Sequence, residues 1–226
     1  MRHGIFQRVR WAVGLGLALA VGAMLRYPGG TALDTGRQGY SMSRNFLSDL
    51  GMTVAYNGLP NRLGAGLFVA SLLLLVIGLG SGLAALIRLL WADAASRRWA
   101  RGAAAFGFFA CAAFAGVAVT PENRVMAIHV SFTMWAWRLV PLVAGLMALA
   151  SLQSSLFRRR VALAWSVLAA LLAGYAALLA WGPSVASAGG LPIQVLAQKA
   201  ATVFVTLALA YIAREADRAP HAIRAG

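Results

Sequence analysis

The chain has 226 residues, of which 61% are hydrophobic and 12% charged, and its formal net charge is +14. Soluble domains are about 45–50% apolar and about 25% charged, so this composition is typical of an integral membrane protein. In a soluble protein such a charge would suggest nucleic-acid binding. Here the arginines flank long apolar runs, which indicates control of membrane topology. We therefore expect membrane lipids as partners and no nucleic acid.

Six apolar runs are long enough to cross a membrane, which requires about 20 residues. The predicted fold is an all-α membrane protein, a single domain over 1–226 in which six transmembrane helices form a bundle. The predicted spans are 9–25, 63–87, 102–120, 125–152, 161–181 and 191–213, followed by a basic tail at 214–226. The first run has the basic start of a signal peptide. Because no convincing cleavage site follows, we expect it to stay as an anchoring helix.

The arginines between the spans predict the orientation of the chain. About 13 of them lie on the side of the two termini and about 5 on the other side, where the loops are longer in total. Positive residues favour the cytoplasmic side, so both termini are expected in the cytoplasm and the protein in the plasma membrane. The long polar segment 26–62 then faces outwards.

This long segment contains a short pattern, RNFLSDLGM at 44–52, with helical periodicity. Apolar side chains share one side of the predicted helix, namely Met42, Phe46, Leu47 and Leu50. Polar side chains share the other side, namely Ser41, Arg44, Asn45, Ser48 and Asp49. The pattern predicts a short amphipathic helix whose polar side faces the outer end of the bundle. Arg44, Asn45, Ser48 and Asp49 are therefore candidate ligand-binding residues.

Two basic residues fall inside predicted spans, where a charge costs at least about 2.5 kcal/mol and often marks function. Arg138 lies near the middle of the fourth span and Lys199 in the sixth. We expect each to join a buried polar site, with local structural pairing as the alternative. Gln194, Gln198, Thr202 and Thr206 recur every four residues beside Lys199. Such a stripe either holds helices together or lines a polar cleft.

The fourth span opens with TPENRVMAIHV, which brings an acid and a histidine to its outer end. Glu122 suits the start of a helix, and His129 is a candidate general base that Asp49 or Glu122 would orient. His129 and Arg138 are nine residues apart and should face opposite sides of the helix. The other two histidines, at 3 and 221, lie far along the chain. No metal site and no cofactor are therefore expected.

These patterns resemble those of the prokaryotic six-helix membrane proteins of domain-of-unknown-function family 998, which is similar to the Frag/DRAM/Sfk group. The likeness rests on Asn-x-x-Ser-Asp-x-Gly (Asn45, Ser48, Asp49, Gly51) and on a proline and an acid followed by histidine (Pro121, Glu122, His129). The span count and the long first outer segment also match. The prokaryotic family implies no settled activity, whereas the wider group implies a role in lipid handling.

Three hypotheses for function remain open on the sequence. The first is binding of a lipid head group or another amphipathic ligand in an outward-facing polar cleft, formed by Arg44, Asn45, Asp49, Glu122 and His129 with Gln194, Gln198 and Lys199 along its wall. The second is a membrane-embedded enzyme that modifies lipids and uses His129 with Asp49 or Glu122. The third is a non-enzymatic scaffold whose polar residues only hold the helices and the loop together. The sequence identifies no protein partner.

Overall fold

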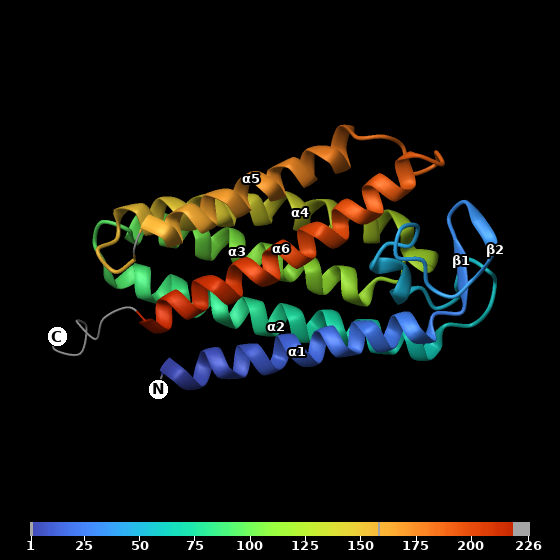
Figure 1. Ribbon diagram of the computed structural model, residues 1–226, viewed down its shortest axis with the longest axis horizontal. Helices are drawn as coiled ribbons and strands as arrows, with labels where there is room; N and C mark the ends of the chain where they lie inside the picture. Colours follow the sequence, from blue (N-terminus) through green and yellow to red (C-terminus); the bar gives the residue numbers. More distant parts are fainter. Residues whose placement is uncertain (1, 158, 219–226) are drawn as a thin grey trace.

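The computed structural model describes residues 2–157 and 159–218, and in this part of the chain six α-helices are long and apolar enough to cross a membrane. They are α1 (Arg2–Arg26), α2 (Arg62–Ala92), α3 (Arg97–Val119), α4 (Glu122–Gln153), α5 (Arg159–Trp181) and α6 (Gly190–Arg218). The helices lie roughly side by side in one bundle, and α6 crosses it obliquely (Figure 1). The chain is therefore a polytopic membrane protein, and the prediction of an all-α six-helix bundle is confirmed.

The helices extend beyond the apolar runs that predicted them. Helix α1 begins at Arg2 and α6 continues to Arg218. Both helices therefore continue past the apolar segments that would lie in the hydrocarbon core of the membrane. Of the predicted tail at 214–226, the last eight residues lie outside the described part. Helix α4 begins at Glu122 and contains Pro141. Its backbone departs from helical geometry at Val125 (φ −139°, ψ 52°) and not at the proline.

Small residues let α1 and α2 approach each other closely. A Cβ added to Gly16 would come within 2.9 Å of the Leu75 side chain, and one added to Gly78 would come within 3.0 Å of Ala12. The Ser71 hydroxyl donates to the carbonyl of Gly16 at 2.7 Å. Close backbone approach and an interhelical hydrogen bond are the usual means by which membrane helices associate.

An aromatic stack joins α3, α4 and α5 in the centre of the bundle. The Trp137 ring lies 5.4 Å from Phe114 and 4.8 Å from Tyr175, both edge to face. This geometry is favoured by the ring quadrupoles. Trp137 belongs to a buried apolar cluster that extends towards the end of the bundle where α1 begins.

The long loop, residues 27–61, folds over the opposite end of the bundle (Figure 1). It contains an antiparallel hairpin of β1 (Gly29–Thr31) and β2 (Asp34–Gln38) and a single 3₁₀ turn, η1 (Ser48–Gly51). A small apolar cluster, Ala23, Tyr27, Leu50, Ala55 and Phe68, attaches the loop to α1 and α2. The short amphipathic helix predicted here is thus reduced to one turn, and the hairpin was not predicted because its second strand, DTGRQ, is polar and exposed.

Candidate functional site

The polar side chains of the long loop point into the protein and hold the loop together. Asn45 is fully buried and Asp49 is 1% exposed. The Asn45 amide donates to the carbonyl of Gly30 (3.0 Å) and to Oδ2 of Asp49 (2.9 Å), and its oxygen accepts from the backbone N–H of Ser41 (2.9 Å). The same Asp49 oxygen accepts from the N–H of Phe46 at 3.0 Å. The predicted amphipathic helix, with a polar side at the mouth of the bundle, does not form here, because Asn45 and Asp49 are buried and their hydrogen bonds satisfy the loop backbone instead.

Helix α6 attaches to this loop through two neighbouring side chains. The ammonium group of Lys199 donates to the carbonyl of Asn45, which also accepts from the Tyr40 hydroxyl at 3.0 Å. Gln198 accepts from the backbone N–H of Leu47 at 2.7 Å. An ammonium group has three donors, so Lys199 can hold the loop and still bind another acceptor.

The buried carboxyl group of Asp49 is neutral over much of the physiological range. Burial raises its pKa to about 8, and the nearby Glu122 contributes in the same direction. The hydrogen bonds from Asn45 and Phe46 and the charge of Lys199 oppose this rise without cancelling it. Within the described residues, Oδ1 of Asp49 is buried and has no hydrogen-bond partner. A neutral carboxyl group is consistent with such surroundings.

Asp49→Asn is expected to flatten the pH dependence of stability. In the folded protein Asp49 keeps its proton up to about pH 8, whereas the unfolded chain releases it near its ordinary pKa of 3.8. The unfolded state therefore binds fewer protons between these values, and stability falls as the pH rises, by at most about 1.4 kcal/mol per pH unit. Asparagine can accept the same two hydrogen bonds without titrating.

The measurement is the melting temperature in detergent between pH 5 and 8. The wild-type protein should lose stability across this interval more steeply than the Asp49→Asn variant. Asp34→Asn, which changes an exposed carboxylate of the same loop, is the control and should melt with the wild-type slope. Equal slopes for all three proteins would contradict the burial of a protonated Asp49.

A second polar cluster lies where α4 begins. His129 is 3% exposed, and its Nδ1 lies 2.6 Å from the carbonyl of Thr120. A carbonyl can only accept, so Nδ1 carries the proton. Nε2 lies 3.9 Å from Glu122, whose other oxygen is 3.5 Å from the Tyr56 hydroxyl. The two residues predicted to meet through the TPENRVMAIH pattern do lie together, whereas no ion pair joins His129 to Asp49 among the described residues.

The remaining candidates are divided between different places. Gln194 donates to the carbonyls of Leu178 and Pro183 and so joins α6 to α5. For this residue the structure agrees with the first interpretation of the polar stripe, in which the stripe holds helices together. Arg44 is half-buried in the loop, and Ser48 faces the carboxylate of Glu122. Arg138 lies on the exposed face of α4 with its guanidinium group 5.9 Å from the centre of the Trp135 ring. The expectation that Arg138 joins a buried polar site was wrong, although its position opposite His129 was predicted.

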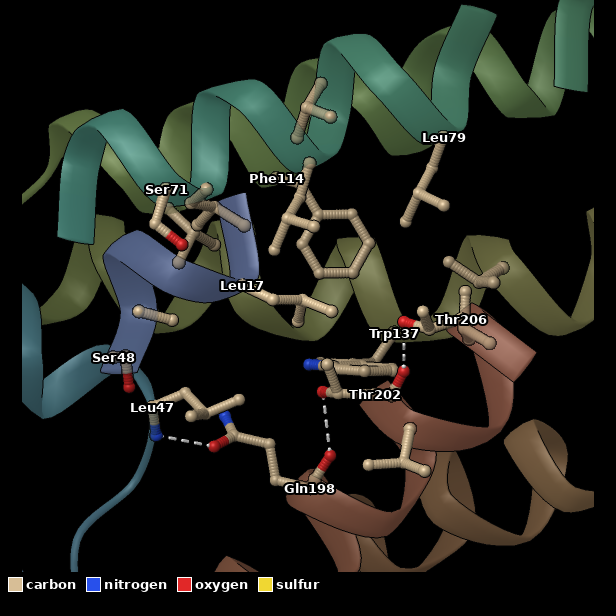
Figure 2. Close-up of a pocket in the computed structure, with 18 of the residues that line it drawn as sticks. Leu17, Leu47, Ser48, Ser71, Leu79, Phe114, Trp137, Gln198, Thr202 and Thr206 are labelled. Atoms are coloured by element: carbon tan, nitrogen blue, oxygen red, sulfur yellow. Dashed lines mark hydrogen bonds between the residues drawn. The ribbon is translucent and has the colours of Figure 1, made fainter. Parts of the chain in front are cut away.

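A cavity of about 380 Å³, which we call the interhelical cavity, lies inside the bundle beneath the loop. Its walls come from α1, α2, α3, α4 and α6, and Figure 2 shows Leu17, Phe114, Trp137 and Thr202 around the same space. Nearly all of its lining is apolar. Most polar groups of the lining lie along α6 and at the loop, namely Ser48, Gln198, Lys199, Thr202 and Thr206, while Ser71 belongs to α2 and Thr133 to α4. Gln198, Thr202 and Thr206 of the predicted polar stripe line this space with Lys199, as one of the two interpretations of the stripe proposed. The apolar residues that form most of the lining are ordinary membrane-span residues, so no sequence pattern predicted the rest of the space.

The wall of the interhelical cavity between α1 and α6 is partly exposed. Leu17 and Val21 of α1 and Val203 of α6 all line the cavity, and each is at least 40% exposed. The two helices contact each other little. Since these flanks would face lipid, an opening at this place would lead sideways into the bilayer. The outward-facing polar cleft stays a prediction.

Comparisons with known proteins identify no relative, since no family model, no curated protein and no solved structure matches the chain. The function is therefore inferred from the geometry of the loop and of the interhelical cavity.

Proposed function

We propose that the protein binds an amphipathic lipid in the interhelical cavity, with the acyl chain between the helices and the polar head group at the loop. The observation that carries this proposal is the combination of an apolar cavity, a partly exposed wall between α1 and α6, and a cationic residue at one end. A molecule already dissolved in the bilayer could enter without crossing water. We propose this cavity in place of the polar cleft as the site.

The shape and lining of the cavity suit an acyl chain. Its volume of about 380 Å³ falls within the range of small-molecule sites. Lining residues of α6 run from Gln198 to Leu209, which is about 16 Å of helix. Thr202 and Thr206 donate to the carbonyls one turn earlier in their own helix, at 2.9 Å each. Their hydroxyl groups are therefore already satisfied in the wall of an apolar channel.

The loop end of the cavity suits an anionic head group. Within the part of the chain that the structure describes, Lys199 is the one charged residue that lines the cavity, and Ser48 and Gln198 line it too. A lysine charge in an apolar wall is costly unless it is paired, and a phosphate or carboxylate would supply a partner. Arg44, a candidate ligand-binding residue, does not line this cavity and is not part of the proposal.

The orientation in the membrane forms part of the same proposal. Helix α1 begins, and α6 ends, at one end of the bundle, and the long loop lies at the other (Figure 1). The excess of arginines on the side of the termini supports a cytoplasmic location for both of them in the plasma membrane. The cavity would then take lipid from the outer leaflet. The resemblance to family 998 and the Frag/DRAM/Sfk group points to lipid handling as well.

Two observations separate this proposal from its alternatives. His129, Glu122 and Asp49 do not line the interhelical cavity, so their position favours binding over a reaction in which His129 acts on a molecule in the cavity. The hydrogen bonds of Asn45, Asp49 and Gln194 to backbone groups favour a structural role for these three side chains. A purely structural protein, however, has no need of an apolar cavity with a wall exposed to the bilayer.

Lys199→Met is expected to weaken retention of an anionic lipid about tenfold relative to a neutral one, which corresponds to about 1.4 kcal/mol. The protein would be purified from vesicles of phosphatidylglycerol and phosphatidylcholine, and the retained lipid measured by native mass spectrometry. Lys199→Arg should keep the preference for phosphatidylglycerol because it keeps the charge.

The control is Gln198→Leu, which removes the neighbouring contact to the loop without removing a charge. It should keep the preference for phosphatidylglycerol even if the loop is loosened. Retention of both lipids by Lys199→Met in the wild-type ratio would refute the assignment of the head group to Lys199. Absence of retained lipid from the wild-type protein would refute lipid binding itself.

A further inference from the structure

A positive charge lies on the outer surface of the bundle, in the middle of a transmembrane helix. Arg138 of α4 is exposed, and the contact recorded for its guanidinium group within the described residues is the face of Trp135 on the same helix. About 20 Å of regular helix separates Arg138 from Val125 on one side and from Gln153 on the other. Half the hydrocarbon core measures about 15 Å, so Arg138 lies near the membrane midplane.

Placing the charge of a lipid-exposed arginine at this depth costs free energy unless another group pairs with it. This cost is largest where the side chain cannot reach an interface. Side chains near helix ends reach the head groups readily, whereas Arg138 is far from both ends. A contact with the face of one tryptophan offsets only part of this cost. The charge therefore requires a group that lies outside the bundle.

The surface beside Arg138 has the shape of a helix-packing site. A hollow of about 290 Å³ lies on α4 within about three turns before Arg138, lined by Ala127, Ile128, Ser131, Phe132 and Trp135. Ala127 and Ser131 are small and lie one turn apart, which lets a neighbouring backbone approach closely. The larger members, Ile128 and Trp135, are 52% and 58% exposed. The hollow and the guanidinium group of Arg138 therefore lie on the same face of α4.

We propose that this face of α4 binds a transmembrane helix of another protein that carries an aspartate or glutamate at the depth of Arg138. A carboxylate is the group that would form a charge-assisted pair with a guanidinium in a dry setting. The acids of this chain stand at positions 34, 49, 93, 122, 215 and 217, at or beyond the ends of the helices. A second copy therefore supplies no carboxylate at this depth, and a two-fold contact would oppose Arg138 to itself.

The test uses synthetic transmembrane peptides because the partner is unidentified. Three leucine–alanine peptides, with Glu, Gln or Lys at the central position, are incorporated with the labelled full-length protein into phosphatidylcholine vesicles at pH 8. Association is measured by energy transfer. The Glu peptide should bind the wild-type protein at least about tenfold more tightly than it binds Arg138→Leu, and the Gln and Lys peptides should show no such difference. Arg159→Leu changes the first residue of α5, far from the middle of a transmembrane helix. It is the control and should behave as the wild-type protein does.

Three results would overturn the proposal. The Glu peptide could bind wild-type and Arg138→Leu proteins equally. Energy transfer between two labelled copies of the chain could depend on Arg138, which would make a second copy the occupant of this face. Retention of phosphatidylglycerol could fall on Arg138→Leu, which would make a lipid the occupant. Because Arg138 is exposed, the variant should melt as the wild-type protein does, so a loss of binding would report on the face itself.

Discussion

Asn45→Ala is expected to lower the free energy of unfolding by about 3–5 kcal/mol. The side chain is fully buried and makes three hydrogen bonds, to the backbone of Ser41, to the backbone of Gly30 and to the carboxyl group of Asp49. Alanine leaves these three groups buried without that partner. Each unsatisfied group costs about 1–3 kcal/mol, and the small cavity left by the amide adds to the loss.

The matched control is Asn57→Ala in the same loop. The Asn57 side chain accepts one hydrogen bond, from the N–H of Leu59 at 3.1 Å, in an exposed place. Its loss should cost less than about 1 kcal/mol. Thermal and denaturant unfolding in detergent would compare the two variants with wild type. Equal stability of Asn45→Ala and Asn57→Ala would show that the loop is not held together by Asn45.

Filling the interhelical cavity is expected to reduce lipid retention at least about tenfold. Thr202→Phe combined with Thr206→Phe places two rings in the channel from one wall. Rings in this space would exclude an acyl chain, while the apolar surroundings accept them without an unpaired polar group. The retained lipid would be measured by native mass spectrometry after purification from phosphatidylglycerol and phosphatidylcholine vesicles.

The control places the same two side chains on the outside of the same helix. Ala200→Phe combined with Leu207→Phe changes exposed positions of α6 that do not line the cavity. This variant should retain lipid as the wild-type protein does. Equal retention by both double variants would place the bound lipid on the outer surface of the bundle and contradict binding in the cavity.

The loop and the cavity belong together structurally. Leu47, Ser48 and Leu50 cover one end of the cavity, while Asn45 and Leu47 are attached to Lys199 and Gln198 of α6. A change that loosens the loop therefore also exposes the head-group end of the proposed lipid site. For this reason Asn45→Ala is expected to reduce lipid retention as a consequence of its effect on stability.

The sequence by itself determined the six helices, because a run of about 20 apolar residues has no other way to satisfy its backbone in a bilayer. It also determined which residues of one helix share a face, since 3.6 residues per turn place His129 and Arg138 on opposite sides. The meeting of Glu122 with His129 was expected from their shared position at the outer end of the fourth span. The resemblance to family 998 stays a prediction.

Only the tertiary structure decided what these residues face. The polar side of RNFLSDLGM could have faced water, but the loop folds back and Asn45 and Asp49 satisfy its buried backbone groups instead. Lys199 faces inwards to the loop and the cavity, whereas Arg138 faces outwards, although both are charges within apolar runs. The interhelical cavity exists only because α1, α2, α3, α4 and α6 each contribute residues to its walls. Periodicity fixes directions around one helix, whereas the packing of the other helices decides which of those directions is buried.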